Sequence, residues 1–109
     1  MRAFFAVANL EQARAFYDVL LGQSGILSPG RLAYVVEGFK LDFYQLTPEQ
    51  SREFQLGPGT PGGCGLCLNY RGPLEQLEGE WLRPMGPTEW GARVGHLLDP
   101  FGYRWEIMG

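Results

Sequence analysis

The sequence predicts an α+β fold made of two successive βαβββ modules. The first reason is an amphipathic helix at residues 10–21, where apolar residues recur at the spacing of three and four that forms one buried stripe. The second is the alternation of apolar and polar residues along 39–46, which is typical of a strand with one buried face. The third is a second series of similar elements after a segment rich in Gly and Pro at 57–63. Antiparallel sheets with helices on one face leave the other face free to form a cleft.

Bulk properties limit the possible functions. A chain of 109 residues is long enough for a single domain with one core, in which we expect module one at 1–46, a linker at 47–63 and module two at 64–109. A net charge of −3 and a pI near 5.0 exclude the basic surface that nucleic-acid binding requires. No apolar run reaches the roughly 20 residues of a membrane span, and no signal peptide is visible, so we expect a cytoplasmic protein without membrane partners.

The elements of module one follow from local signals. Asn9, with Gln12 three residues later, predicts a helix that begins at Leu10, and Gly22 is placed to end it. Thr47 followed by Pro48 predicts one or two further helical turns. The expected strands are 2–7, 25–28, 31–36 and 39–46.

The second module ends in a hairpin. Asp99-Pro100-Phe101-Gly102 suits a type I turn, because Asp caps the turn, Pro presets φ and Gly relieves the exit. In the arm at 103–108, alternation places Arg104, Glu106 and Met108 on one face. The other expected elements of this module are strands at 65–70, 82–85 and 91–98 and a short helix at about 73–77 that carries Leu74, Leu77 and Trp81.

Three motifs in order resemble the vicinal oxygen chelate superfamily, which includes glyoxalase I, bleomycin resistance proteins and extradiol dioxygenases. Phe16-Tyr17 followed by Leu21-Gly22 is similar to the end of the family's first helix, Phe-Tyr-x-x-x-Leu-Gly. Trp90-Gly91-x-Arg93, then Asp99-Pro100-x-Gly102 and Glu106, resemble its last two strands. The resemblance implies the glyoxalase/bleomycin resistance fold and, because the family commonly pairs modules within or between chains, a homodimer.

The resemblance also implies where a divalent metal would be held. The family's first-strand ligand, usually His, aligns with Arg2, and the corresponding ligand of module two aligns with Gly65 or Cys64. The last-strand ligands align with Asp42 and Glu106. Two carboxylates without an imidazole suit the family's metals poorly. Arg2 brings a fixed positive charge that we interpret as a substitute for the cation, and we expect it within reach of Glu106 or Asp42.

His96 and the cysteines have alternative interpretations. One interpretation of His96 is a strand residue whose side chain is satisfied by a neighbour. In the other, which we favour, alternation with Val94 and Leu98 points His96 into the cleft, at a position where fosfomycin resistance proteins, which share the fold that the resemblance implies, place a tyrosine that contacts substrate. We assign no catalytic residue, and His96 is the single candidate. Cys64 and Cys67 have the C-x-x-C spacing but lie in a predicted strand, which favours small half-buried residues over a redox or zinc site.

The sequence supports three hypotheses. The first is a metal-free protein without a cofactor that resembles bleomycin-type resistance proteins and holds an apolar or planar small molecule in its cleft. The second is a glyoxalase- or dioxygenase-type enzyme with a metal on Glu106, Asp42 and His96, and the third is an accessory domain without a ligand. The predicted ligand-binding residues are Arg2, Phe4, Asp42, Tyr44, Cys67, Asn69, Trp90, His96, Arg104 and Glu106, with Lys40 and Met108 as further candidates.

Overall fold

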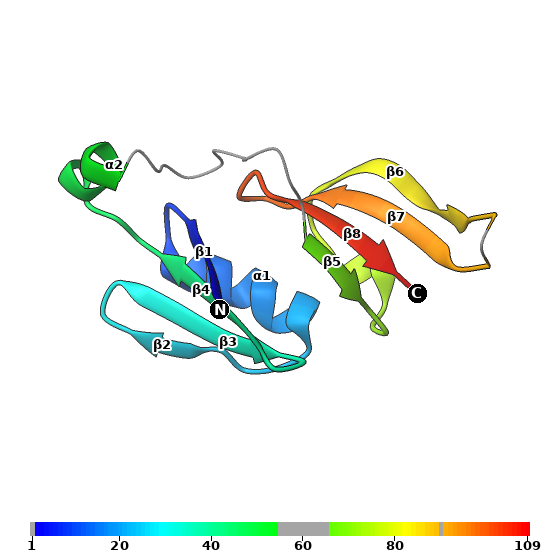
Figure 1. Ribbon diagram of the computed structural model, residues 1–109, viewed down its shortest axis with the longest axis horizontal. Coiled ribbons are helices and arrows are strands. Elements are labelled where there is room, and N and C mark those ends of the chain that lie inside the picture. The colour runs from blue at the N-terminus through cyan, green and yellow to red at the C-terminus, as the bar shows by residue number, and fades with distance from the viewer. Residues whose placement is uncertain (1, 55–65, 90) are drawn as a thin grey trace. The chain divides into compact units, whose positions relative to one another are not determined.

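The computed structural model describes residues 2–54, 66–89 and 91–109, and the chain falls into two compact units, Met1–Gly59 and Thr60–Gly109. Figure 1 shows the elements of each unit. Unit one contains β1 (Arg2–Ala6), α1 (Leu10–Leu21), β2 (Ile26–Ser28), β3 (Arg31–Val36), β4 (Phe39–Tyr44) and α2 (Pro48–Phe54). Unit two contains β5 (Leu66–Asn69), the 3₁₀ helix η1 (Leu74–Gln76), β6 (Glu80–Pro87), β7 (Arg93–Leu98) and β8 (Arg104–Met108).

Each unit carries one four-stranded sheet, and the two sheets have the same topology. The strand orders are β1-β4-β3-β2 and β5-β8-β7-β6. In both sheets the first and last strands of the unit pair in parallel, and the other neighbours are antiparallel. The predicted α+β class and the two βαβββ modules are therefore confirmed.

The helix α1 has the predicted bounds. Oδ1 of Asn9 accepts a hydrogen bond of 2.9 Å from the backbone N–H of Gln12, and Gly22 ends the helix in the left-handed conformation at φ 64°. The apolar stripe of α1 packs against β3 and β4, where the ring of Tyr17 stacks on Phe43 with centroids 4.0 Å apart. Burial of this stripe defines the core of unit one.

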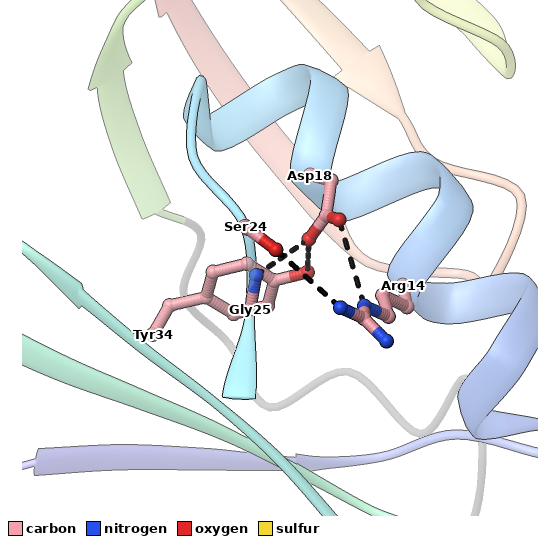
Figure 2. Close-up of polar contacts among 5 residues, drawn as sticks. All are labelled: Arg14, Asp18, Ser24, Gly25 and Tyr34. Carbon is pink, nitrogen blue, oxygen red and sulfur yellow. Dashed lines mark hydrogen bonds and ion pairs between the residues drawn. The ribbon is translucent and has the colours of Figure 1, made fainter. Parts of the chain in front are cut away.

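A carboxylate on α1 ties the helix to the next two strands (Figure 2). Oδ1 of Asp18 accepts hydrogen bonds from the Tyr34 hydroxyl at 2.7 Å and from the backbone N–H of Gly25 at 2.8 Å. Arg14, one helical turn earlier, holds Oδ2 of Asp18 at 3.6 Å and donates to Ser24 at 3.4 Å. Burial, followed by the hydrogen bond to Asp18, raises the pKa of Tyr34. This network fixes β2 and β3 against the helix.

The predicted helix of module two is reduced to one 3₁₀ turn. The turn is Leu74–Gln76, and Trp81, which we expected on the helix, lies in β6. Pro73 stands before the turn in an extended conformation, and Gly79 follows it at φ 127°. The short stretch between them cannot offset the cost of nucleating an α-helix.

The other predicted elements are present with small shifts at their ends. The strand 31–36 has the predicted bounds, whereas β4 ends at Tyr44 rather than at residue 46 and β6 is longer than 82–85. Asp99 forms the predicted turn, because its backbone carbonyl accepts from Gly102 at 3.1 Å and its Oδ1 accepts from the backbone of Phe101 and Tyr103. Of the predicted linker at 47–63, residues 48–54 form α2, and residues 55–63 lie outside the described residues. Among the residues that are described, no helix combines the length and apolarity needed to cross a membrane.

Candidate functional site

In the first sheet, the face opposite α1 gathers the predicted site residues of module one. Leu41 and Phe43 point toward the helix and are buried, so residues of the other parity point away from it. The strand register places Arg2 beside Lys40, and Phe4 beside Asp42. We call the set Arg2, Phe4, Lys40, Asp42 and Tyr44 the polar face of the first sheet.

An ion pair occupies this polar face. Nη1 of Arg2 lies 2.9 Å from Oδ2 of Asp42, at hydrogen-bonding distance. The Arg2 side chain is 51% exposed and the Asp42 side chain only 4%. Of the two carboxylates expected near Arg2, Glu106 and Asp42, the structure places Asp42 beside it. The buried carboxylate is thus paired with a cation of the protein itself.

Aromatic side chains lie beside the ion pair. Phe4 is 54% exposed and contacts the ring of Tyr44 edge-on, with centroids 5.9 Å apart. Val35 and Ile26 of the neighbouring strands are also exposed, and their register partners belong to the same face. This face thus combines a charged pair with apolar surface that is open to solvent.

The second sheet has an equivalent polar face. Trp105 and Ile107 point to the buried side of β8, so Arg104, Glu106 and Met108 point to the other side. The register places both Cys67 of β5 and His96 of β7 directly beside Glu106. The polar face of the second sheet is formed by Cys67, Asn69, His96, Arg104, Glu106 and Met108.

Glu106 is the centre of this second set. Its Oε2 lies 3.3 Å from Nε2 of His96, an ion pair when the imidazole is protonated, and its Oε1 accepts from the thiol of Cys67 at 3.4 Å. Sγ of Cys67 also lies 3.3 Å from Sδ of Met108. Desolvation, followed by the hydrogen bond to Glu106 and its charge, raises the pKa of Cys67. A thiol with a raised pKa is protonated at neutral pH and is a poor nucleophile.

Some predicted site positions are not among the described residues, and one residue of the polar face of the second sheet was not predicted. Three of the predicted positions lie outside the described residues: Cys64, Gly65 and Trp90. In the described part of β5, Cys67 is the register partner of Glu106. Arg83 of β6 pairs with His96 on the polar face and was not predicted. The irregular register between β6 and β7 explains this, because alternation alone does not predict which residues face each other across a bulge.

The resemblance implies a divalent metal, and the described side chains do not fit one well. Asp42 is paired with the permanent charge of Arg2, which opposes a second cation at the same carboxylate. Across the described parts of the chain, no three His, Cys, Asp or Glu side chains are grouped so that they could hold a metal ion. Glu106 and His96, two members of the alternative set, lie 3.3 Å apart in unit two, and Asp42 belongs to unit one.

The sheet topology and the two polar faces define a protein with the glyoxalase/bleomycin resistance fold. Solved structures with this fold match almost the whole chain. The chain is similar to a glyoxalase-related enzyme from Fulvimarina pelagi, with 24% identity and a TM-score of 0.74 over 97% of this chain and 84% of that one. It is also similar to a glyoxalase/bleomycin resistance protein from Albidiferax ferrireducens, with 20% identity and a TM-score of 0.70 over 98% and 95% of the two chains.

A third similar structure is a glyoxalase/bleomycin resistance protein/dioxygenase from Nocardioides, with 21% identity and a TM-score of 0.66 over 99% of this chain and 80% of that one. No protein-family model matches the sequence, and no curated protein sequence matches it significantly. At these identities the likeness establishes the fold, and function has to be argued from the side chains.

Proposed function

We propose that the chain is a metal-free, small-molecule-binding member of the vicinal oxygen chelate superfamily that resembles bleomycin-type resistance proteins. The single observation that carries this proposal is the ion pair of Arg2 with Asp42. The guanidinium remains charged at all physiological pH values, so it persistently competes with a divalent cation for that carboxylate. Asp42 thereby becomes a structural partner of Arg2 rather than a free metal ligand.

The surface beside the ion pair suits an apolar or planar ligand. The exposed ring of Phe4, set edge-on to Tyr44, offers a flat aromatic surface on which a planar molecule can stack. Arg2 supplies hydrogen-bond donors that can orient the ligand. A few polar anchors on an apolar surface are the common form of a small-molecule site.

Metal binding tests the metal-free part of this proposal. We expect equilibrium dialysis of the protein against Ni²⁺, Mn²⁺, Fe²⁺ and Zn²⁺ to show no stoichiometric binding. Arg2→His removes the fixed charge and places an imidazole beside Asp42, so this variant should gain affinity for divalent metal in isothermal titration. Tight metal binding by the parent, or no gain by a folded variant, contradicts the interpretation of Arg2 as a substitute for the cation.

Ligand binding needs a separate test. Native mass spectrometry of protein purified from its own host should show a retained small molecule. Phe4→Ala should abolish its retention, and Leu82→Ala is the matched control because Leu82 is an exposed apolar residue of the other unit. Equal retention by both variants would contradict a site on the polar face of the first sheet.

The alternative is a metal-dependent enzyme of the glyoxalase or dioxygenase type. The observation that favours it is the approach of His96 to Glu106, two of the three ligands that the resemblance implies, with Nε2 and Oε2 3.3 Å apart. The same dialysis tests this alternative. If metal binds the parent through these ligands, Glu106→Gln, Asp42→Asn and His96→Asn should each weaken binding.

We also propose that the protein is a cytoplasmic homodimer. The exposed apolar side chains Ile26 and Val35 of the first sheet form surface that a second copy would cover. Light scattering at micromolar concentration should give the mass of a dimer. A monomeric mass would contradict the assembly but would not affect the proposed ligand site.

A further inference from the structure

Unit one contains a hollow of about 420 Å³ at the end of its sheet where the turn between β2 and β3, the end of β4 and the start of α2 meet. This volume falls within the range of small-molecule sites, about 300 to 1,000 Å³. Tyr44 and Arg31 are direct register partners, so the hollow adjoins the polar face of the first sheet. The lining residues are Ser28, Pro29, Gly30, Arg31, Tyr44, Gln45, Leu46 and Gln50.

The hollow is built by backbone contacts between its walls. The backbone N–H of Gln45 donates to the carbonyl oxygen of Gly30 at 3.1 Å, which joins the end of β4 to the turn. Gly30 has a φ of 76°, a conformation that favours glycine. The side chain of Thr47 and that of Gln50 bond reciprocally to each other's backbone N–H, at 3.2 and 3.0 Å, and fix the start of α2.

Two lining glutamines present donors rather than acceptors. Oε1 of Gln45 accepts from the backbone N–H of Leu10 at 3.0 Å, and Oε1 of Gln50 accepts from the backbone N–H of Thr47 at 3.0 Å. Since a backbone N–H can only donate, each amide is oriented with its oxygen engaged. The NH₂ groups of Gln45 and Gln50 are therefore the parts of these side chains left for a ligand.

The residues that line the hollow carry positive charge and no negative charge. Arg31 contributes a guanidinium, and no Asp or Glu lines the hollow. Among the side chains that the structure describes, those of 2–52, 66–89 and 91–109, no acid forms an ion pair with Arg31. A guanidinium beside two amide donors has the chemistry of an oxyanion site, even though the whole protein carries a net charge of −3.

We propose that this hollow binds the oxyanion group, carboxylate or phosphate, of a small molecule. Arg31 supplies the charge and a forked pair of N–H donors, and the amides of Gln45 and Gln50 supply further donors. Pro29, Leu46 and the ring of Tyr44 provide apolar wall for the remainder of the molecule. The inference does not depend on the ligand proposed for the polar faces.

The test uses the full-length protein labelled with ¹⁵N and three probes. Sodium benzoate carries a carboxylate, inorganic phosphate carries the other oxyanion, and benzamide is the neutral analogue of benzoate. We expect benzoate, phosphate or both to shift the backbone resonances of Gly30 and Arg31 and the side-chain NH₂ resonances of Gln45 and Gln50, with saturation. Binding of benzoate alone assigns the site to carboxylates and binding of phosphate alone assigns it to phosphates. Both outcomes support the proposal.

Two variants separate a specific site from general attraction of anions. Arg31→Gln should weaken the saturable binding by about tenfold or more, since it removes the charge-assisted hydrogen bonds. Arg52→Gln makes the same change in net charge on α2, outside the lining, and should leave the affinity within about twofold of the parent. Absence of saturable shifts with either anion, equal binding of benzamide and benzoate, or equal loss in the two variants would overturn the proposal. Unchanged resonances of α1 and of the residues of β4 away from the hollow, which belong to the same unit as Arg31, serve as the check that Arg31→Gln is folded.

Discussion

Nη1 of Arg2 lies 2.9 Å from Oδ2 of Asp42, and the two partners differ in exposure, with 51% of the Arg2 side chain but only 4% of the Asp42 side chain accessible to solvent. Removing Arg2 leaves a buried carboxylate without this cation. Removing both Arg2 and the charge of Asp42 leaves no unpaired charge at this place. The contribution of the ion pair to stability can therefore be measured as a coupling free energy between substitutions at Arg2 and Asp42.

We expect Arg2→Met to lower the free energy of unfolding by about 1 kcal/mol, because the exposed half of the pair is screened by water and the buried half is not. A double-mutant cycle with Asp42→Asn, measured by urea unfolding, should show a coupling of about 0.5 to 1 kcal/mol. Lys40→Met is the matched control, since Lys40 is the register partner of Arg2. A coupling of zero, or an equal loss in the control, would show that the ion pair does not stabilise the sheet.

The hydroxyl of Tyr34 makes the stability of unit one depend on alkaline pH. Burial and Asp18 raise the pKa of Tyr34 above its ordinary value of 10.0, so the folded state holds the proton more tightly than the unfolded state. The resulting stability is fully present below about pH 10 and is lost as the pH rises further, with a limiting slope of about 1.4 kcal/mol per pH unit.

Tyr34→Phe should flatten this alkaline loss while costing about 1 to 2 kcal/mol at neutral pH, where Asp18 loses a hydrogen-bond donor. Urea unfolding between about pH 8 and pH 11 measures both effects. Tyr44→Phe removes a hydroxyl from the same sheet and should keep the parental pH dependence. An unchanged alkaline slope in Tyr34→Phe would contradict the assignment.

Cys67 should react slowly with alkylating reagents. In a Cys64→Ser background, the rate of modification by iodoacetamide should rise with pH and reach its midpoint above the ordinary thiol value of 9.0, because desolvation and Glu106 favour the protonated thiol. Glu106→Gln should lower the pKa of Cys67 and speed the reaction at about pH 8 by a few fold. Glu89→Gln, an exposed acid of the same unit, is the control. A midpoint below 9.0 in the parent would be inconsistent with the structure.

Asp99 should be among the residues that stabilise unit two most. The buried Asp99 carboxylate accepts from the indole Nε1–H of Trp105 at 2.9 Å, and from two backbone N–H groups of the turn. Asp99→Ala removes this acceptor and should cost about 2 to 4 kcal/mol, whereas Asp99→Asn keeps one oxygen and should cost about half as much. Thermal unfolding followed by circular dichroism ranks the two variants. Equal stability of the parent and Asp99→Ala would show that the motif acts only through its backbone.

The sequence by itself determined the local structure and the face of the sheet on which each strand residue lies. Asn9 and Gly22 bound α1 at the predicted residues, because caps act on the backbone beside them. The alternation of β4 and β8 placed Asp42 and Glu106 on the faces where the structure has them, since a period of two needs no knowledge of the partner strand. Fold class and the choice of face were thus predictable from short-range patterns.

Only the tertiary structure decided which of these side chains meet. Arg2 reaches Asp42 because β1 pairs with β4 in one particular register, and the two residues are 40 positions apart in the chain. Asp18 meets Tyr34 through the packing of α1 on β3, and no short-range signal in the sequence marks that contact. The hollow around Arg31 likewise depends on a turn, a strand end and a helix start meeting at one place. Local periodicity sets the face of each residue, but non-local pairing and packing set its neighbours, because many registers bury the same apolar residues and differ only in which polar groups they bring together.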